Sequence, residues 1–256
     1  MRPGYTVLRT QPSFERLSLL FAGILASDFW PIRGTCEVPE GSVSLACENA
    51  TAKALRVASP LAAAGFPSDA AWQHAPAVRF AHDWQGRNAD AECETEVRLL
   101  WVPDMLYLRF HARYRTITVF ENAAPNGRRD ELWNRDVAEV FLQPAELSGR
   151  HYLEFEVSPN GFWIDLEILP QEKRDLQSGL KCHAAIDQQE AIWSAELALP
   201  MKSLTAHFDP SKEWRVNFYR VEGRQEPRFY SAWMPTGTPA PNFHVPESFG
   251  RLTFEG

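Results

Sequence analysis

A regular alternation of apolar and polar residues runs through the middle of the chain, from Glu131 to Leu169. This stretch reads ELWNRDVAEVFLQP, then a short polar loop, then HYLEFEVSPNGFWIDLEIL. A period of two residues is typical of a β-strand with one buried face. The Asn160-Gly161 pair between two alternating runs is a strong hairpin signal, because both residues tolerate positive φ. The pattern therefore predicts three successive antiparallel strands.

The alternation divides these strands into two faces of different chemistry. The apolar positions form the predicted core face: Ala138, Val140, Leu142, Leu153, Phe155, Val157, Phe162, Ile164, Leu166 and Ile168. The other face carries five carboxylates and three aromatic rings: Glu139, Phe141, Tyr152, Glu154, Glu156, Trp163, Asp165 and Glu167. Like charges placed opposite one another destabilise a sheet, and solvated faces normally mix both signs. Two interpretations stay open: an ordinary solvated face, or a ligand-binding face whose carboxylates accept hydrogen bonds from hydroxyl groups.

The remaining pattern predicts an all-β fold. TEVRLLWV and MLYLRFHARY form a hairpin around Pro103-Asp104, and strands LKCHAAI, AIWSAELALP, WRVNFYRVEG and FGRLTFEG follow. Many short strands with turn signals and few helical segments are typical of an antiparallel β-sandwich, immunoglobulin-like or jelly-roll-like, with two sheets. In the second strand of the first hairpin, one face carries Leu106, Leu108, Phe110 and Ala112, which we expect in the core. Arg109 and His111 lie on the other face, and we expect one or the other at the wall of the acidic face.

The first 50 residues have a different texture and are predicted to form an N-terminal extension, with the sandwich spanning 51–256. An apolar run from Leu17 to Ala26 follows Arg2, Arg9 and Arg16, which is the outline of a signal peptide. Glu15 lies beside this run, so an amphipathic helix is an equal alternative. No run of 18 apolar residues exists, and a transmembrane helix is therefore not expected.

Charge and cysteine content exclude several classes of function. A net charge of −7 and a pI near 5.6 argue against a nucleic-acid or anionic-membrane surface, since both need basic residues. The four cysteines contain no C-x-x-C pair, so a structural zinc site is not expected and neither Cys93 nor Cys182 is predicted to bind metal. Two disulfides, with Cys36–Cys47 as one, or four thiols both remain open. Asn49-Ala50-Thr51 matches a glycosylation sequon.

Sequence motifs of common enzyme classes are absent: there is no G-x-S-x-G, H-E-x-x-H, phosphate-binding glycine loop or dinucleotide fingerprint. The ordered segments LLWVPDMLYLRFHAR, LWNRDVAEVFLQP, YLEFEVSPNG, WSAELALP, WRVNFYRVEG, YSAWMPT and NFHVPESFGRLTF instead resemble family 9 carbohydrate-binding modules and their stand-alone relatives. The resemblance extends from Pro67 to the C-terminus. It implies a β-sandwich that grips the end of a sugar chain between two aromatic rings, an extracytoplasmic location, and in some members structural calcium.

Individual residues carry this resemblance. The family pattern W-x-x-D-x-x-E-x-F is matched by Trp133, Asp136, Glu139 and Phe141. The resemblance makes Trp133 the first ring of the clamp and Glu139 a hydroxyl acceptor. Phe243 stands where the family has the second ring, a Trp, and His244 follows it. Two positions depart from the pattern: Glu156 stands where a binding Arg is expected, and Tyr114 replaces an acidic residue. Trp163 completes the expected ligand-binding set.

Non-catalytic saccharide binding is therefore the leading hypothesis, with two alternatives. A glycan-active hydrolase could draw a carboxylate pair from Glu139, Glu154, Glu156 and Asp165, because glycoside hydrolysis uses two carboxyl groups. A haem-binding sandwich with His and Met ligands is the third. The sequence leaves the sugar and the oligomeric state undetermined.

Overall fold

The computed structural model describes residues 50–58, 65–124 and 126–256. The expected N-terminal helix, the Cys36–Cys47 pair and Asn49 lie outside these ranges. The strands are β1 Thr51–Arg56, β2 Ala77–Phe80, β3 Thr95–Val102, β4 Met105–Arg113, β5 Val137–Gln143, β6 Tyr152–Val157, β7 Trp163–Ile168, β8 Lys173–Asp175, β9 Lys181–Asp187, β10 Ile192–Pro200, β11 Trp214–Glu222, β12 Phe229–Ala232 and β13 Gly250–Glu255. Helical turns are α1 Asp69–His74, η1 Ala91–Cys93, η2 Leu132–Asn134, α2 Met201–Leu204 and η3 Pro246–Ser248. The described part is thus all-β, as predicted.

The strands form one continuous mixed sheet in the order β8-β7-β6-β5-β11-β13-β1-β3-β4-β10-β9, with β12 on β11 and β2 on β3. Strand β1 runs parallel to both β13 and β3, while the other pairs within the described ranges are antiparallel. The strictly antiparallel two-sheet sandwich is therefore wrong in detail. Alternation fixes which side chains are buried, but it does not fix which neighbours an edge segment such as β1 takes.

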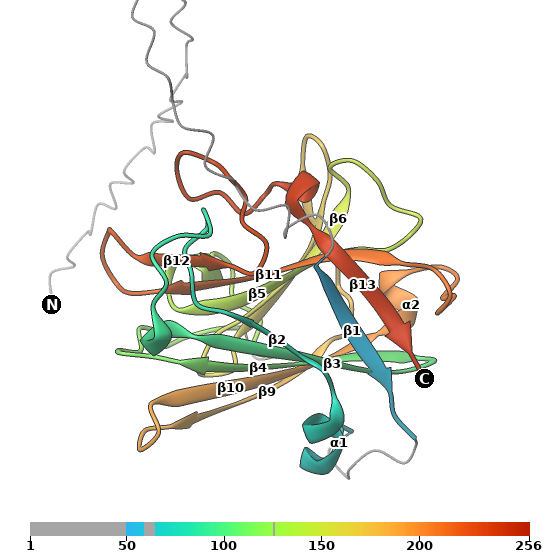
Figure 1. Cartoon of the computed structure of the whole chain (residues 1–256), viewed down its shortest axis with the longest axis horizontal. Coiled ribbons are helices and arrows are strands. Elements are labelled where there is room, and N and C mark those ends of the chain that lie inside the picture. Colours follow the sequence, from blue (N-terminus) through green and yellow to red (C-terminus); the bar gives the residue numbers. More distant parts are fainter. Residues whose placement is uncertain (1–49, 59–64, 125) are drawn as a thin grey trace, which may run out of the picture. The chain divides into compact units, whose positions relative to one another are not determined.

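The sheet curls so that its two halves face one another (Figure 1), with strands β4, β9 and β10 below β5 and β11. The main core between them combines residues of β3, β4 and β10 with residues of β5, β6 and β11. As predicted, Leu106, Leu108, Phe110 and Ala112 of β4 and Ala138, Val140, Leu142, Leu153, Phe155 and Val157 of β5 and β6 are buried there. Trp72 of α1 is buried in a separate cluster against Leu100 and Tyr107.

Strand β7 lies in the opposite register to the predicted one. Phe155 pairs with Asp165 and Val157 with Trp163, so Trp163 points to the main-core side of the sheet. Strands β6 and β7 are joined by a three-residue loop in which Gly161 has φ 81°, and the Ser158 N–H donates to the Phe162 carbonyl to close it. The predicted placement of Val157 and Phe162 on one face would need a loop with an even number of residues. The predicted core face is therefore wrong for β7, whose Ile164 and Leu166 pack on the other side.

The outer face of β5, β6 and β11 is covered rather than solvated. A second apolar cluster packs there: Leu132, Val137, Phe141, Tyr152, Ile164, Leu166, Tyr219, Val221, Ala232, Phe243 and Phe249. Strand β5 is buried along its whole length as a result. Loop 241–249 and turn η2 supply residues to this cluster from outside the sheet, and the acidic residues of β5 and β6 are consequently enclosed.

Two further predictions concern the thiols and the membrane. Cys93 is buried and Cys182 half-buried, and each is a free thiol whose pKa is raised to about 12, chiefly by burial. Among the residues described, no helix is long and apolar enough to span a bilayer.

Candidate functional site

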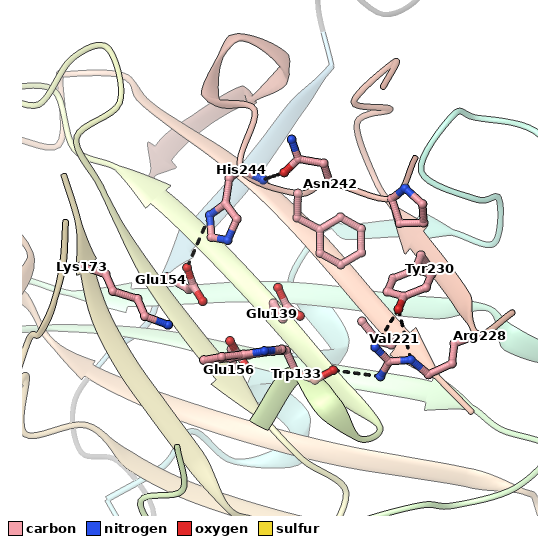
Figure 2. A pocket seen from close by; sticks show the side chains of 12 residues that line it. Trp133, Glu139, Glu154, Glu156, Lys173, Val221, Arg228, Tyr230, Asn242 and His244 are labelled. Atoms are coloured by element: carbon pink, nitrogen blue, oxygen red, sulfur yellow. Dashed lines mark hydrogen bonds and ion pairs between the residues drawn. The ribbon is translucent and has the colours of Figure 1, made fainter. Parts of the chain in front are cut away.

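A pocket of about 260 Å³ opens on the outer face of β5 and β6, beside the second apolar cluster (Figure 2). Its floor comes from β5, β6 and β11, and its walls from η2, β8, β12 and loop 241–244. The lining residues are Trp133, Glu139, Glu154, Glu156, Lys173, Val221, Arg228, Tyr230, Pro241, Asn242, Phe243 and His244. The structure thus brings together five of the predicted site residues: Trp133, Glu139, Glu156, Phe243 and His244.

Three glutamates form the acidic floor. Glu139 lies directly opposite Glu156 in the β5–β6 ladder, and Glu154 is two residues along the same strand as Glu156. Their exposed fractions are only 3, 1 and 3 per cent, respectively. Burial, reinforced by the neighbouring Glu154 charge, holds the pKa of Glu139 well above its usual range, although the Arg228 cation opposes this. Burial likewise raises the pKa of Glu156, and the charges of Glu139 and Glu154 raise it further.

Trp133 forms one wall because turn η2 places its ring beside the start of β5. The Arg228 Nη1 group donates a hydrogen bond of 2.9 Å to the Trp133 carbonyl, which fixes the backbone of this turn. The Lys173 Nζ atom lies 4.2 Å from the centroid of the Trp133 ring, within the range of a cation–π contact. In Figure 2 the Lys173 amine extends from its strand toward Trp133 and the glutamates.

Loop 241–244 forms the opposite wall and is held by the second apolar cluster. The Phe243 ring stacks on Tyr219 at 4.3 Å with an interplanar angle of 14°, and the Tyr219 hydroxyl donates to the Phe243 carbonyl at 3.0 Å. The His244 ring stacks on Phe141 at 5.4 Å, and its Nδ1 is 2.6 Å from the Tyr152 hydroxyl. One face of the Phe243 ring is therefore already occupied. That Trp133 and Phe243 face one another as a clamp stays a prediction.

Arg228 and Tyr230 connect the two walls. The Arg228 Nη2 group donates to the Tyr230 hydroxyl at 2.7 Å, and that hydroxyl donates to Glu226 at 2.6 Å. Sequence reasoning missed Lys173, Arg228, Tyr230 and Asn242 as site residues. Lys173 and Arg228 come from charged segments without alternation, so the pattern carried no signal for them. Tyr230 begins the segment YSAWMPT, which resembles the family, but no pattern within that segment points to ligand binding.

Three of the predicted residues lie elsewhere. Arg109 on β4 pairs with Glu196 at 2.5 Å and with Asp69 at 2.7 Å, and His111 Nδ1 is 2.9 Å from the Ser194 hydroxyl. The expectation that Arg109 or His111 lies at the wall of the acidic face is wrong, because β4 pairs with β3 and β10 rather than with the acidic strands. Trp163 is on the far side of the sheet, as its register requires.

Asp136 does not line the pocket either, although it belongs to the matched motif. It is fully buried, and its two carboxylate oxygens accept hydrogen bonds from the backbone N–H groups of Gly223 at 2.8 Å and Thr118 at 2.9 Å. Asp136 thus ties two loops to the start of β5, and it positions the strand that carries Glu139.

The described residues do not fit the structural calcium that the resemblance implies. Asp83, in a tight loop, already accepts hydrogen bonds from the backbone of Gln85 and Arg87 and from the Asn88 side chain. Within 50–58, 65–124 and 126–256, no group of three or more His, Cys, Asp or Glu residues is arranged to hold a metal ion.

Comparison with known proteins is consistent with this geometry. The sequence profile of carbohydrate-binding family 9 matches residues 93–254. An extracellular protein of Arthroderma benhamiae is 23% identical over 179 residues, covering 63% of this chain and 78% of its own length. A solved structure from Bacteroides uniformis superposes with a TM-score of 0.63 at 18% identity, over 80% of this chain and 99% of that one. A family 9 carbohydrate-binding module from Caldicellulosiruptor kristjanssonii, solved with cellotriose, superposes with a TM-score of 0.57 at 14% identity. The match covers 81% of this chain and 94% of that one. At these identities the structural matches show the fold.

Proposed function

Because this chain belongs to carbohydrate-binding family 9, we propose that it binds a saccharide in the pocket between Trp133 and loop 241–244. The observation that carries the proposal is the convergence in one pocket of an aromatic wall and three buried glutamates. A family 9 module solved with cellotriose has the same fold, which supports the ligand class. A location outside the cytoplasm stays a prediction.

The chemistry of a pyranose suits this arrangement. The C–H face of the ring is apolar and stacks on an aromatic side chain, while the hydroxyl rim needs hydrogen-bond partners. Trp133 supplies the stacking surface, and Phe243 with His244 supplies the opposite wall. The floor glutamates accept hydrogen bonds from hydroxyl groups, and Asn242 and Tyr230 offer further polar contacts at the rim. Lys173 must leave the Trp133 ring if a sugar is to stack on the face that it contacts.

Calorimetric titration with mono- and oligosaccharides, comparing the wild type with Trp133→Ala, tests the proposal. The loss of an aromatic anchor typically costs about 2 kcal/mol or more in binding, roughly a thirtyfold weaker Kd. Trp163→Ala is the matched control, because Trp163 is a half-buried tryptophan on β7 whose side chain lies on the main-core face of the sheet, opposite the pocket. This control should keep wild-type affinity. The proposal fails if no saccharide binds, or if Trp133→Ala binds as tightly as the wild type.

A glycoside hydrolase is the second candidate, favoured by the raised pKa values of Glu139 and Glu156. A carboxyl group with a raised pKa can act as a general acid near neutral pH, and its neighbour as base or nucleophile. Turnover of chromogenic glycosides that is abolished in Glu139→Gln would establish this activity. Binding without turnover leaves the saccharide-binding proposal as it stands.

A further inference from the structure

The floor of the pocket holds two carboxylate oxygens that the described part of the protein leaves without a hydrogen-bond partner. These are Oε2 of Glu154 and Oε2 of Glu156, both shielded from solvent. A buried acceptor without a partner costs free energy, and native proteins rarely keep one without a reason. Both residues line the pocket, so a ligand that carries donors would satisfy these oxygens.

The cations around the floor are mostly committed to other partners. The guanidinium of Arg228 donates to the Trp133 carbonyl, to Glu226 and to the Tyr230 hydroxyl, so its N–H groups hold the walls. The His244 Nδ1 atom contacts the Tyr152 hydroxyl at 2.6 Å and is 3.9 Å from Glu154 Oε2. Lys173 reaches the pocket from β8, and its ammonium lies on the Trp133 ring. The charges of Arg228 and Lys173 act on Glu139 and Glu156, respectively, but within the described residues neither cation forms an ion pair with the three floor carboxyl groups.

We propose that this pocket selects saccharides that carry a protonated amine, that is amino sugars, over neutral sugars. This inference rests on the proposed saccharide-binding function and names its ligand class. An ammonium group donates up to three hydrogen bonds and carries the charge that the floor lacks, and charge-assisted hydrogen bonds are about twice as strong as neutral ones. The Lys173 contact shows that an ammonium fits against the Trp133 ring in this pocket. An acidic sugar, by contrast, would add a further carboxylate to an acidic floor.

The raised pKa values of Glu139 and Glu156 agree with this assignment. Both arise from burial and from neighbouring like charges, and a ligand ammonium would offset the second of these causes. Hydroxyl groups of a neutral sugar would satisfy the free oxygens but would leave the repulsion among the three carboxyl groups in place.

Three trisaccharides that differ at C2 of each sugar ring test the inference. Cellotriose has a hydroxyl there, the N-acetylglucosamine trimer an acetamide, and the glucosamine trimer an amine. Calorimetry at about pH 6.5, below the pKa of about 7.7 typical of an α-amino group, keeps the amine charged. We expect the glucosamine trimer to bind at least about tenfold more tightly than the other two, which corresponds to about 1.4 kcal/mol.

Two Glu→Gln variants locate the origin of the preference. Glu156→Gln removes one floor charge, and we expect the ratio of the cellotriose Kd to the glucosamine-trimer Kd to fall at least about threefold, a change of roughly 0.7 kcal/mol. Glu167→Gln is the control, because Glu167 pairs with His151 outside the pocket and should leave the ratio unchanged. A cooperative thermal unfolding transition in each variant serves as the check that both variants fold.

Each outcome decides the inference. If cellotriose or the N-acetylglucosamine trimer binds as tightly as the glucosamine trimer, the amine preference is wrong and saccharide binding stands. If the preference for the glucosamine trimer is as large in Glu156→Gln as in Glu167→Gln, it arises from the net negative charge of the protein. The inference is wrong in that case too. If no trisaccharide or other sugar binds, the proposed function fails with it.

Discussion

Replacement of Arg220 by Met should destabilise the protein strongly, because this side chain is the cation of a fully buried polar cluster. Arg220 points from β11 into one end of the main core, where its guanidinium lies 5.2 Å from the Trp193 ring centroid. Its Nη2 donates to Glu222 at 2.9 Å and its Nη1 to the Arg113 carbonyl at 2.9 Å. Asp136 is close enough that the two charges interact. Methionine fills similar space but leaves both carboxylates without their cation.

The expected cost follows from the burial of these charges. Removal of one partner from a buried ion pair typically costs about 3–5 kcal/mol, since the other charge stays buried and unpaired. Asp136 and Glu222 keep backbone hydrogen bonds from Gly223, Thr118 and Arg115, which places the expected value at about 3 kcal/mol, the lower end of that range. Because Asp136 anchors the start of β5, the loss should also loosen the strand that carries Glu139.

Urea denaturation at neutral pH, followed by tryptophan fluorescence, measures this cost. The double variant Arg220→Met/Glu222→Met removes both members of the pair, and we expect it to be less destabilised than the sum of the single variants by about 1–3 kcal/mol. A cost below about 1 kcal/mol for Arg220→Met, or strict additivity in the double variant, would show that the substitution leaves no uncompensated buried charge.

Two further predictions concern the acidic floor and metal ions. Because the folded-state pKa of Glu156 is raised above its ordinary value of 4.5, the folded protein holds more protons than the unfolded chain above that pH, and stability is lost as the pH rises. Glu156→Gln should therefore raise the thermal unfolding midpoint more at about pH 8 than at about pH 5, and a variant that is less stable than the wild type at pH 8 would contradict this. EDTA should leave the midpoint unchanged, since the described carboxylates do not form a metal site, and a fall that calcium reverses would contradict this prediction.

The sequence predicted those features that depend on local alternation. The main-core faces of β4, β5 and β6 are correct, because each of these strands carries only apolar residues on one face and its charged residues on the other. The resemblance to family 9 then brought Trp133, Glu139 and Phe243 into one site, and the structure places all three around the same pocket.

The errors come from features that alternation does not encode. The three-residue loop at Pro159–Gly161 shifts β7 by one residue, which moves Trp163 and Asp165 to the core side of the sheet. The order of the strands places Arg109 and His111 away from the pocket, because β4, which carries them, lies between β3 and β10 and not beside β5 or β6. Lys173 and Arg228 reach the pocket from segments with no periodic pattern, so only the three-dimensional structure could show them.

The indole N–H spectrum of ¹⁵N-labelled protein tests saccharide binding at this pocket most directly. Each of the nine tryptophans contributes one indole N–H signal, and comparison with Trp133→Phe assigns the signal of Trp133. On titration with cellotriose and with the glucosamine trimer, we expect a saturable shift of the Trp133 signal, while the signal of Trp163, on the opposite face of the sheet, stays in place. A Trp133 signal that does not move at saturating saccharide, or a shift confined to tryptophans away from the pocket, would show that no saccharide binds in this pocket.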